Sequence, residues 1–228
     1  MSAVLTPEKE VEFEFPSQSL VGKTAFVTGA SRGIGKAIAL ALASAGADVA
    51  LSCNTGGALA EQVRDGIREI GRKSEYYAHN IADPAEVEKM HTEIIRDFGH
   101  IDILVNNAGI TRDKSFKKMT KEMWDTVMNV DLNGVFLVTK QFIDDMAERG
   151  WGRVITIGGG LSIQPMSMQP HYNASLAARH NLAVSLAREL KDTGVTSNIV
   201  SPGAILVDSV QRFLTDLAPA HGLSLIHI

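Results

Sequence analysis

Short apolar segments alternate with longer amphipathic segments from residue 24 onward, and this alternation constrains the fold most. The segments with the length and composition of strands are TAFVT, DVALSC, SEYYAHN, DILVNN, RVITI and TSNIV. The sequence predicts helices between them: three that end at Ala45, Ile70 and Phe98, a long stretch over 121–149, and one from Tyr172 to Leu190. A β-α-β-α order requires a parallel sheet covered on both faces. We therefore expect an α/β fold with a doubly wound, Rossmann-type sheet.

A glycine-rich segment lies between the first predicted strand and the first predicted helix. Small residues in VTGASRGIGKAIA let the backbone turn tightly and approach a pyrophosphate. The amide groups and the dipole at the helix N-terminus then stabilise its charge. A ligand-free turn explains lone glycines but fits this whole strand–turn–helix unit poorly. We predict a dinucleotide site that includes Gly29, Ser31, Arg32, Gly33, Ile34 and Gly35.

The end of the second predicted strand favours NADP(H) over NAD(H). A nucleotide without a 2′-phosphate is usually held by a carboxylate there. In this chain the segment is LSCN, which ends in Cys53 and Asn54. Arg32 in the glycine loop can neutralise a 2′-phosphate through a charge-assisted hydrogen bond, although a solvated loop arginine is the alternative.

Composition predicts a soluble protein with a small-molecule substrate. The 22 basic and 26 acidic residues give a formal net charge of −4, which suggests neither a nucleic-acid nor a membrane partner. The first twenty residues lack the basic start and apolar stretch of a signal peptide. The single cysteine, Cys53, cannot form an internal disulfide, which weakly favours a reducing compartment. We expect a cytoplasmic location and no metal site.

The 228 residues, 45% of them hydrophobic, fit one large domain. We predict an N-terminal arm at 1–20, a single dinucleotide-binding Rossmann domain at 21–220 and a non-native tail at 221–228. In the arm, EVEFEF alternates with the period of a short strand. In the tail, LSLIHI resembles a translated sequencing adapter more than a natural terminus.

Several motifs in one register resemble the short-chain dehydrogenase/reductase family. They are TGASRGIG at 28–35, NNAG at 106–109, Tyr172 and SPG at 201–203, and the resemblance covers about residues 20–215. The region from NNAG to RVITI is most similar to acetoacetyl-CoA reductases and 3-oxoacyl-ACP reductases. The resemblance implies further cofactor contacts from Asn80, Ile81, Asn107, Ala108, Gly109, Pro202 and Gly203.

The resemblance also implies a homo-oligomer, built in part by a final strand and a glycine-rich end. This chain stops before them, so we expect the sheet to lack the family's last strand. TSNIV would then form an uncovered edge, which favours aggregation and makes the family's assembly less favourable.

Of the catalytic roles that the resemblance implies, this chain keeps one. In the family a tyrosine gives a proton to the carbonyl oxygen, and a lysine one helical turn later lowers its pKa and holds the ribose. A serine orients the carbonyl, and an asparagine supports a proton relay. Tyr172 fills the first role, but Leu176 stands at the lysine position, Gly159 at the serine position and Asp131 at the asparagine position. Val207 likewise replaces a threonine that contacts the nicotinamide.

Two other residues lie near enough in sequence to substitute. Ser162, ten residues before Tyr172, could act if its loop is rearranged, but an ordinary loop hydroxyl is the simpler interpretation. Arg179, seven residues after Tyr172, could supply positive charge because helical side chains lean toward the N-terminus. A surface or interface arginine is the simpler interpretation there too. Asp131 could relay protons, although a carboxylate near Tyr172 disfavours its phenolate.

The sequence thus leaves two functions from different classes. The first is an NADP(H)-dependent short-chain oxidoreductase with impaired catalysis, which reduces a 3-oxoacyl thioester or similar ketone to the 3-hydroxy compound. A tyrosine with a pKa of about 10 can still donate its proton at neutral pH, but a well-placed acid/base group contributes about 10²–10⁴ in rate. The second is a non-catalytic, NADP-binding scaffold.

Overall fold

A computed structural model describes residues 19–203 and residue 205 of the chain, and it confirms the predicted alternation of strands and helices. Six strands form one parallel sheet in the order β3-β2-β1-β4-β5-β6. They are β1 (Thr24–Val27), β2 (Asp48–Cys53), β3 (Ser74–Ala78), β4 (Ile103–Asn106), β5 (Gly152–Ile157) and β6 (Val195–Val200). The strand order reverses between β1 and β4, and ligands of doubly wound sheets bind at the carboxyl ends beside such a switch point.

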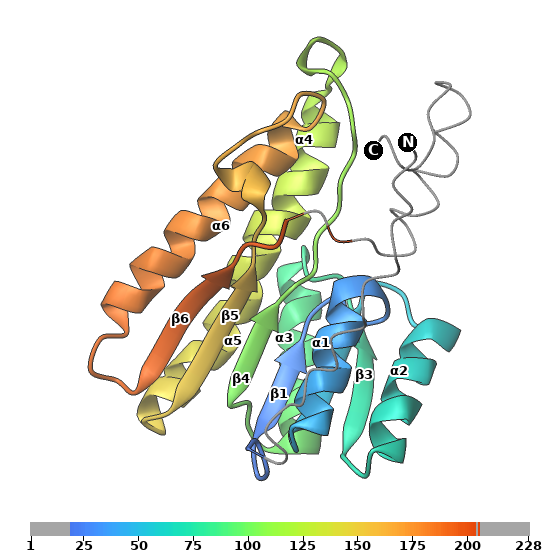
Figure 1. Cartoon of the computed structure of the whole chain (residues 1–228), viewed down its shortest axis with the longest axis vertical. Coiled ribbons are helices and arrows are strands. Elements are labelled where there is room, and N and C mark those ends of the chain that lie inside the picture. The colour runs from blue at the N-terminus through green and yellow to red at the C-terminus, as the bar shows by residue number, and fades with distance from the viewer. Residues whose placement is uncertain (1–18, 204, 206–228) are drawn as a thin grey trace, which may run out of the picture.

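Helices cover the two faces of the sheet (Figure 1). On one face lie α1 (Gly33–Ser44) and α2 (Ala58–Glu69). On the other lie α3 (Pro84–Phe98), α5 (Gly134–Glu148) and the C-terminal part of α6 (Pro170–Glu189). The fold class predicted from the sequence is confirmed, with most helix ends within one or two residues of the expected positions.

The predicted helical stretch over 121–149 is interrupted. It consists of α4 (Lys121–Met128), a π-helical turn η2 (Asn129–Asn133) and α5. Two short 3-10 turns, η1 (Phe116–Lys118) and η3 (Gly160–Ser162), lie in the loops that follow β4 and β5. A π turn carries one extra residue, and such turns often lie at functional sites.

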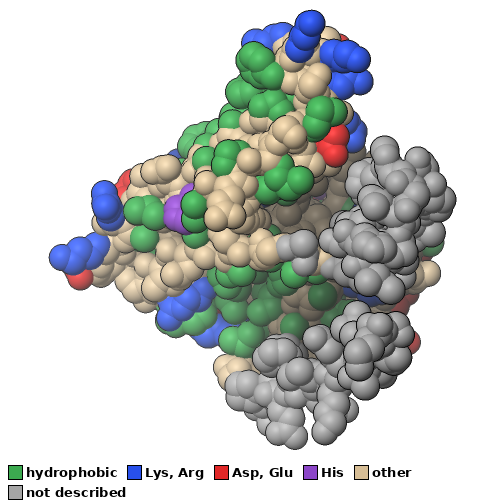
Figure 2. All heavy atoms as spheres, turned by 45° about the horizontal axis from the view of Figure 1, so that its top comes forward, with side chains coloured by type: hydrophobic (Ala, Val, Ile, Leu, Met, Phe, Trp, Pro, Cys, Tyr) green, Lys and Arg blue, Asp and Glu red, His purple; other side chains and the backbone are tan. Residues whose placement is uncertain are grey.

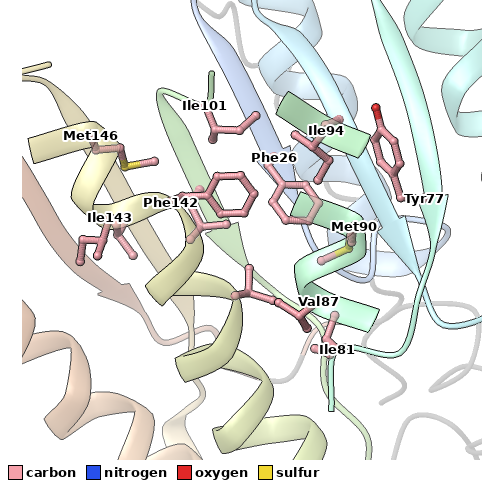
Figure 3. Close-up of a cluster of buried hydrophobic side chains, with 14 of the residues drawn as sticks. Phe26, Tyr77, Ile81, Val87, Met90, Ile94, Ile101, Phe142, Ile143 and Met146 are labelled. Atoms are coloured by element: carbon pink, nitrogen blue, oxygen red, sulfur yellow. The ribbon is translucent and has the colours of Figure 1, made fainter. Parts of the chain in front are cut away.

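The larger buried cluster fixes α3 and α5 on the sheet (Figure 3). Phe26 of β1 and Phe142 of α5 are at most 2% exposed, and their ring centroids lie 5.4 Å apart. Met90 and Ile94, one turn apart on α3, are fully buried beside them. Full burial of a large apolar side chain contributes about 1.5–3 kcal/mol, so this cluster holds both helices firmly.

Small residues let α1 lie close to the sheet. Ala39 and Ala43 are at most 1% exposed and pack against Val27, Val49 and Val105 of three strands. This close packing places the N-terminus of α1 beside the carboxyl ends of β1 and β4.

Some predictions concern residues outside the described range: residues 1–18 of the N-terminal arm, which contain EVEFEF, Val207, and the tail at 221–228. Within the described sheet, β6 is an edge strand. None of the helices described here combines the length and the apolar composition needed to cross a bilayer.

Candidate nucleotide-binding and catalytic site

The glycine loop and the NNAG turn interlock at the carboxyl ends of β1 and β4. Thr28 follows β1, and its Oγ1 accepts hydrogen bonds from the amides of Asn107 and Ala108, both at 3.0 Å. In return, Asn107 Nδ2 donates to the carbonyls of Thr28 and Gly29 at 2.9 and 3.2 Å. The structure therefore brings together two segments that the sequence predicts to hold the cofactor.

Two glycines permit this close approach. Gly29 has a φ of +65°, and a Cβ built on it would lie 2.9 Å from the Cα of Ala108. A Cβ on Gly35 would lie 2.4 Å from the Gly29 carbonyl oxygen and 2.5 Å from Asn107 Nδ2. Neither position accepts a side chain unless the backbone moves, so the loop geometry depends on glycine.

Helix α1 begins without a side-chain cap. Arg32 occupies the N-cap position and no side chain accepts a hydrogen bond there, whereas Asp83 at α3 accepts from two backbone amides. Uncapped amides at a helix N-terminus attract an anion. Ser31 and Ile34 are half-buried and Arg32 is exposed. This start of α1 fits a pyrophosphate laid across Gly33–Gly35.

The end of β2 carries no negative charge near the glycine loop. The backbone amide of Ala30 donates to the Ser52 carbonyl at 3.0 Å, which joins the loop to the last residues of β2. Cys53 is 7% exposed, and burial raises the pKa of its thiol, so it stays neutral. Asn54, the next residue, is exposed. A neutral strand end beside an exposed Arg32 suits a nucleotide that carries an additional phosphate.

The side chains of two other predicted cofactor residues, Asn80 and Ile81, make contacts within the fold. The Asn80 side chain accepts from the amide of Ala82 at 3.0 Å. The Ile81 side chain is 7% exposed and lies in the core (Figure 3), and a Cβ on Gly134 would be 2.9 Å from its Cδ1. An adenine beside this segment would therefore contact the backbone of Ile81 and not its side chain.

The SPG segment lies against the loop that follows β5. The amide of Gly160 donates to the Pro202 carbonyl at 3.3 Å, and that of Gly158 donates to the Val200 carbonyl at 2.8 Å. Gly203 is exposed. These contacts bring the predicted nicotinamide segment next to Gly159, which stands at the serine position.

Leu176, where the resemblance predicts a lysine, is buried against the loop that follows β5. It lies one turn after Tyr172 on α6 and is 1% exposed. A Cβ on Gly159 would lie 3.2 Å from Leu176 Cδ1. The backbone at Gly159 is extended, with a φ of −178°, so its conformation does not require glycine. The two positions at which the resemblance predicts a serine and a lysine thus face each other, and the Leu176 side chain points toward Gly159.

Asp131 is fully buried in the π-helical turn. Its Oδ1 accepts a hydrogen bond from the amide of Ile110 at 2.8 Å. Burial raises the pKa of this carboxyl to about 6, although the Arg179 guanidinium, the Ile110 amide and the Ser175 hydroxyl each favour the ionised form. Asp131 is therefore ionised at neutral pH but takes up a proton far more readily than an exposed aspartate.

The expectation that Arg179 is a surface or interface residue is wrong. It is 3% exposed, and its Nη1 and Nη2 donate to the carbonyls of Ile157 and Ala108, each at 3.0 Å. Its Nε donates to the carbonyl of Asp131, and Nη2 lies 3.5 Å from Asp131 Oδ2. The side chain reaches from α6 to the ends of β4 and β5, where carbonyls and a carboxylate compensate its burial. The sequence carried one signal, the aspartate at 131 where the resemblance implies an asparagine, and a buried carboxylate needs a cationic partner.

Tyr172 is half-buried near this pair. Burial raises the pKa of its hydroxyl, Asp131 raises it further, and Arg179 lowers it. The neighbouring His171, which the sequence did not single out, is fully buried: its Nδ1 accepts from the Tyr172 amide at 2.8 Å, and Nε2 lies 2.9 Å from the Arg112 carbonyl. Both ring nitrogens of His171 therefore have hydrogen-bond partners inside the protein.

Two loops form a rim next to Tyr172. The amide of Lys114 donates to the Met168 carbonyl at 2.7 Å, which joins the loop after β4 to the loop after β5. Large apolar side chains are exposed on both loops: Phe116, Ile163, Met166 and Met168. Basic side chains gather with apolar ones at this end of the molecule (Figure 2). Ser162 Oγ is buried and has no hydrogen-bond partner within residues 19–203.

The buried carboxyl of Asp131 predicts a pH-dependent stability. Its pKa in the folded chain, about 6, lies above its ordinary value of 3.8, so the folded state binds this proton more tightly. The contribution of this proton to the stability of the fold is complete below about pH 4 and is lost as the pH rises through about 6. Asparagine does not titrate in this range. We therefore expect the free energy of unfolding of Asp131→Asn, relative to that of the native chain, to rise by about 3 kcal/mol from pH 4 to pH 7. Urea unfolding at several pH values measures this difference, and a difference independent of pH would contradict the assignment.

The sequence is similar to known proteins over the same range. A family model described as short chain dehydrogenase matches residues 23–218. Acetoacetyl-CoA reductase from Cupriavidus necator is 37% identical over 195 residues, which cover 86% of this chain and 79% of that protein. The 3-oxoacyl-(acyl-carrier-protein) reductase FabG from Escherichia coli is 40% identical over 196 residues (86% and 78%). Nodulation protein G from Azospirillum brasilense is 40% identical over 198 residues (87% and 80%). The matched range contains every described strand and helix.

Proposed function

Because the chain belongs to the short-chain dehydrogenase family of oxidoreductases, we propose that it binds NADP(H) and slowly reduces a 3-oxoacyl thioester or similar ketone to the 3-hydroxy compound. The observation that carries the proposal is the interlocked glycine loop together with Tyr172 on α6, where Leu176 stands at the position of the family's lysine. The names of the acetoacetyl-CoA and 3-oxoacyl reductases support the substrate class. The apolar rim of Phe116 and Ile163 fits an acyl chain.

The choice of NADP(H) rests on the charges around the glycine loop. Arg32 is exposed at the N-cap of α1, and Cys53 and Asn54 leave the end of β2 neutral. A 2′-phosphate would meet a cation there and no carboxylate. A homo-oligomeric state and a cytoplasmic location stay predictions from the family and from the composition.

In the proposed reaction Tyr172 is the proton donor. Bound NADPH would supply the hydride. Burial and the nearby Asp131 raise the pKa of the Tyr172 hydroxyl, so it is protonated at neutral pH and can donate to a carbonyl oxygen. The same environment makes Tyr172 a poor acceptor of a proton from an alcohol. We therefore expect ketone reduction to be faster than the reverse oxidation at neutral pH.

A non-catalytic, NADP-binding scaffold is the second candidate. Leu176, at 1% exposure, places hydrocarbon where the family has an ammonium group, and Gly159 offers no hydroxyl to a substrate carbonyl. Without the ammonium group and the hydroxyl, the site lacks two of the family's catalytic groups, while the glycine loop that would bind the nucleotide is intact.

NADPH binding and NADPH consumption, measured side by side, separate the two candidates. NADPH is titrated by fluorescence, and its oxidation is followed with acetoacetyl-CoA, for the native chain and for Tyr172→Phe. Binding with slow turnover that depends on Tyr172 supports the reductase. Binding without turnover supports the scaffold, and absence of binding contradicts both.

Replacement of Arg32 by alanine tests the cofactor preference. We expect Arg32→Ala to weaken NADPH binding about tenfold and to leave NADH binding nearly unchanged, because a charge-assisted hydrogen bond to the 2′-phosphate contributes about 1.5 kcal/mol. Lys140→Ala removes one exposed positive charge from α5 and is the matched control. An equal loss for both nucleotides, or native affinities that favour NADH, would count against an NADP(H) site.

A further inference from the structure

The Asp131–Arg179 pair lies directly beneath the NNAG turn. A Cβ on Gly109 would be 3.2 Å from Arg179 Nη2 and 3.4 Å from Asp131 Oδ2, so the backbone of the turn rests on both charged groups. Arg179 also donates to carbonyls at the ends of β4 and β5. Arg179 is 3% exposed and Asp131 is fully buried. The two side chains therefore form a charge pair inside the protein, at the carboxyl ends of the central strands.

Tyr172 and Arg179 belong to the same face of α6. Seven residues correspond to about 10.5 Å along a helix, and the arginine side chain leans back toward the N-terminus and shortens that separation. Leu176 lies between them in sequence and is buried. Hydrocarbon screens charges far less than water does, so the pair acts on Tyr172 over this distance.

We propose that the buried Asp131–Arg179 pair replaces the missing lysine in setting the charge state of Tyr172, with Arg179 favouring the phenolate and Asp131 opposing it. Arg179 is a positioning residue, since its donors are directed at backbone carbonyls and Asp131. The inference rests on the proposed function in one respect: Tyr172 must be the proton donor for the pair to influence catalysis.

The charged groups that act on Tyr172 come from two elements. Arg179 on α6 lowers the pKa of the Tyr172 hydroxyl, and Asp131 in the π-helical turn raises it. His171, also on α6, directs its two ring nitrogens to the Tyr172 amide and the Arg112 carbonyl. Removal of either member of the pair should therefore shift the titration of Tyr172 in opposite directions. A pair that is too distant or too well screened to act on Tyr172 gives no such opposition of sign.

Fluorine NMR can follow this titration without cofactor or substrate. The chain has three tyrosines, so uniform 3-fluorotyrosine gives three resonances, and Tyr172→Phe identifies the one of interest. We expect Asp131→Asn to lower the pKa of this residue and Arg179→Met to raise it, because the first change removes a nearby negative charge and the second removes a nearby positive charge. Asp144→Asn, which removes an exposed carboxylate of α5, is the control and should leave it unchanged.

The outcome of Asp131→Asn decides the proposal even if Arg179→Met does not fold. The amide has nearly the same shape and can keep the hydrogen bond from Ile110. An unchanged or raised pKa in Asp131→Asn overturns the proposal, as do shifts of the same sign in both variants. Failure of the proposed function appears separately, as absence of NADPH oxidation in the native chain while the two shifts remain opposite.

Discussion

Gly159→Ser and Leu176→Lys together should raise the rate of 3-oxoacyl-thioester reduction by about 10²–10⁴, and either change alone should have a small effect. A serine at 159 alone meets Leu176, because its Cβ would lie 3.2 Å from Leu176 Cδ1. A lysine at 176 alone has no hydroxyl beside it to hold the carbonyl. Groups that act as one unit are strongly non-additive. The measurement is NADPH oxidation with acetoacetyl-CoA at saturating NADPH.

A suitable control is Gly159→Ser with Leu176→Met, which restores the hydroxyl and keeps an apolar, flexible side chain at 176. It should stay close to the native rate. Asp131 should be retained in the first round, because a new lysine adds a second cation near Arg179 and Asp131 is their shared counter-charge. If the double variant folds, binds NADPH and still reduces no 3-oxoacyl substrate, the lost-reductase hypothesis fails and the scaffold is favoured.

Arg179→Met should reduce the free energy of unfolding by about 3–5 kcal/mol at pH 7. The change leaves the buried carboxylate of Asp131 without its cation and removes the donors to the carbonyls of Ala108 and Ile157. Urea unfolding measures the loss. Without Arg179 the pKa of Asp131 lies above its native value of about 6, so the loss should shrink as the pH falls toward 6, because the carboxyl of the variant then takes up a proton and no longer needs a counter-charge.

The combined variant Asp131→Asn with Arg179→Met should recover part of that stability, since it leaves no unpaired charge in the interior. Arg96→Met is the matched control: this arginine is 70% exposed and pairs with its neighbour Asp97, so its loss should cost less than about 0.5 kcal/mol. Equal losses at the two arginines would mean that the Asp131–Arg179 pair contributes no special stability.

Local sequence patterns were sufficient for most of the fold. Strand and helix periods identified all six described strands, and the glycine loop could be recognised because Gly29 and Gly35 lie in a strand–turn–helix context. The π-helical turn was not predicted, because the residues on both sides continue a helical pattern and one extra residue leaves little trace in it. The sequence resemblance placed Ile81 beside the adenine and did not say which of its atoms face the nucleotide, since the packing of its side chain against Gly134 is a tertiary contact that local sequence does not reveal.

At the expected catalytic positions, too, local sequence does not reveal the tertiary contacts. Family spacing located Leu176 and Gly159, but only the fold shows that their side-chain positions face each other. Arg179 seemed an exposed residue because arginine is rarely buried without a partner. Its partner is 48 residues earlier in the chain, in a turn that the sequence did not predict.

The π-helical turn determines both the position of Asp131 in the site and the packing of α5 in the core of the protein. Each residue of a helix advances by about 100°, so deletion of the extra residue in Asn129–Asn133 would rotate all of α5 by that angle relative to α4. Phe142 and Met146, which are buried against the sheet, would then turn away from it. The packing of α5 therefore depends on the turn, whether or not any reaction depends on Asp131. A lineage in this family can lose its chemistry and still inherit the outline of the site that performed it.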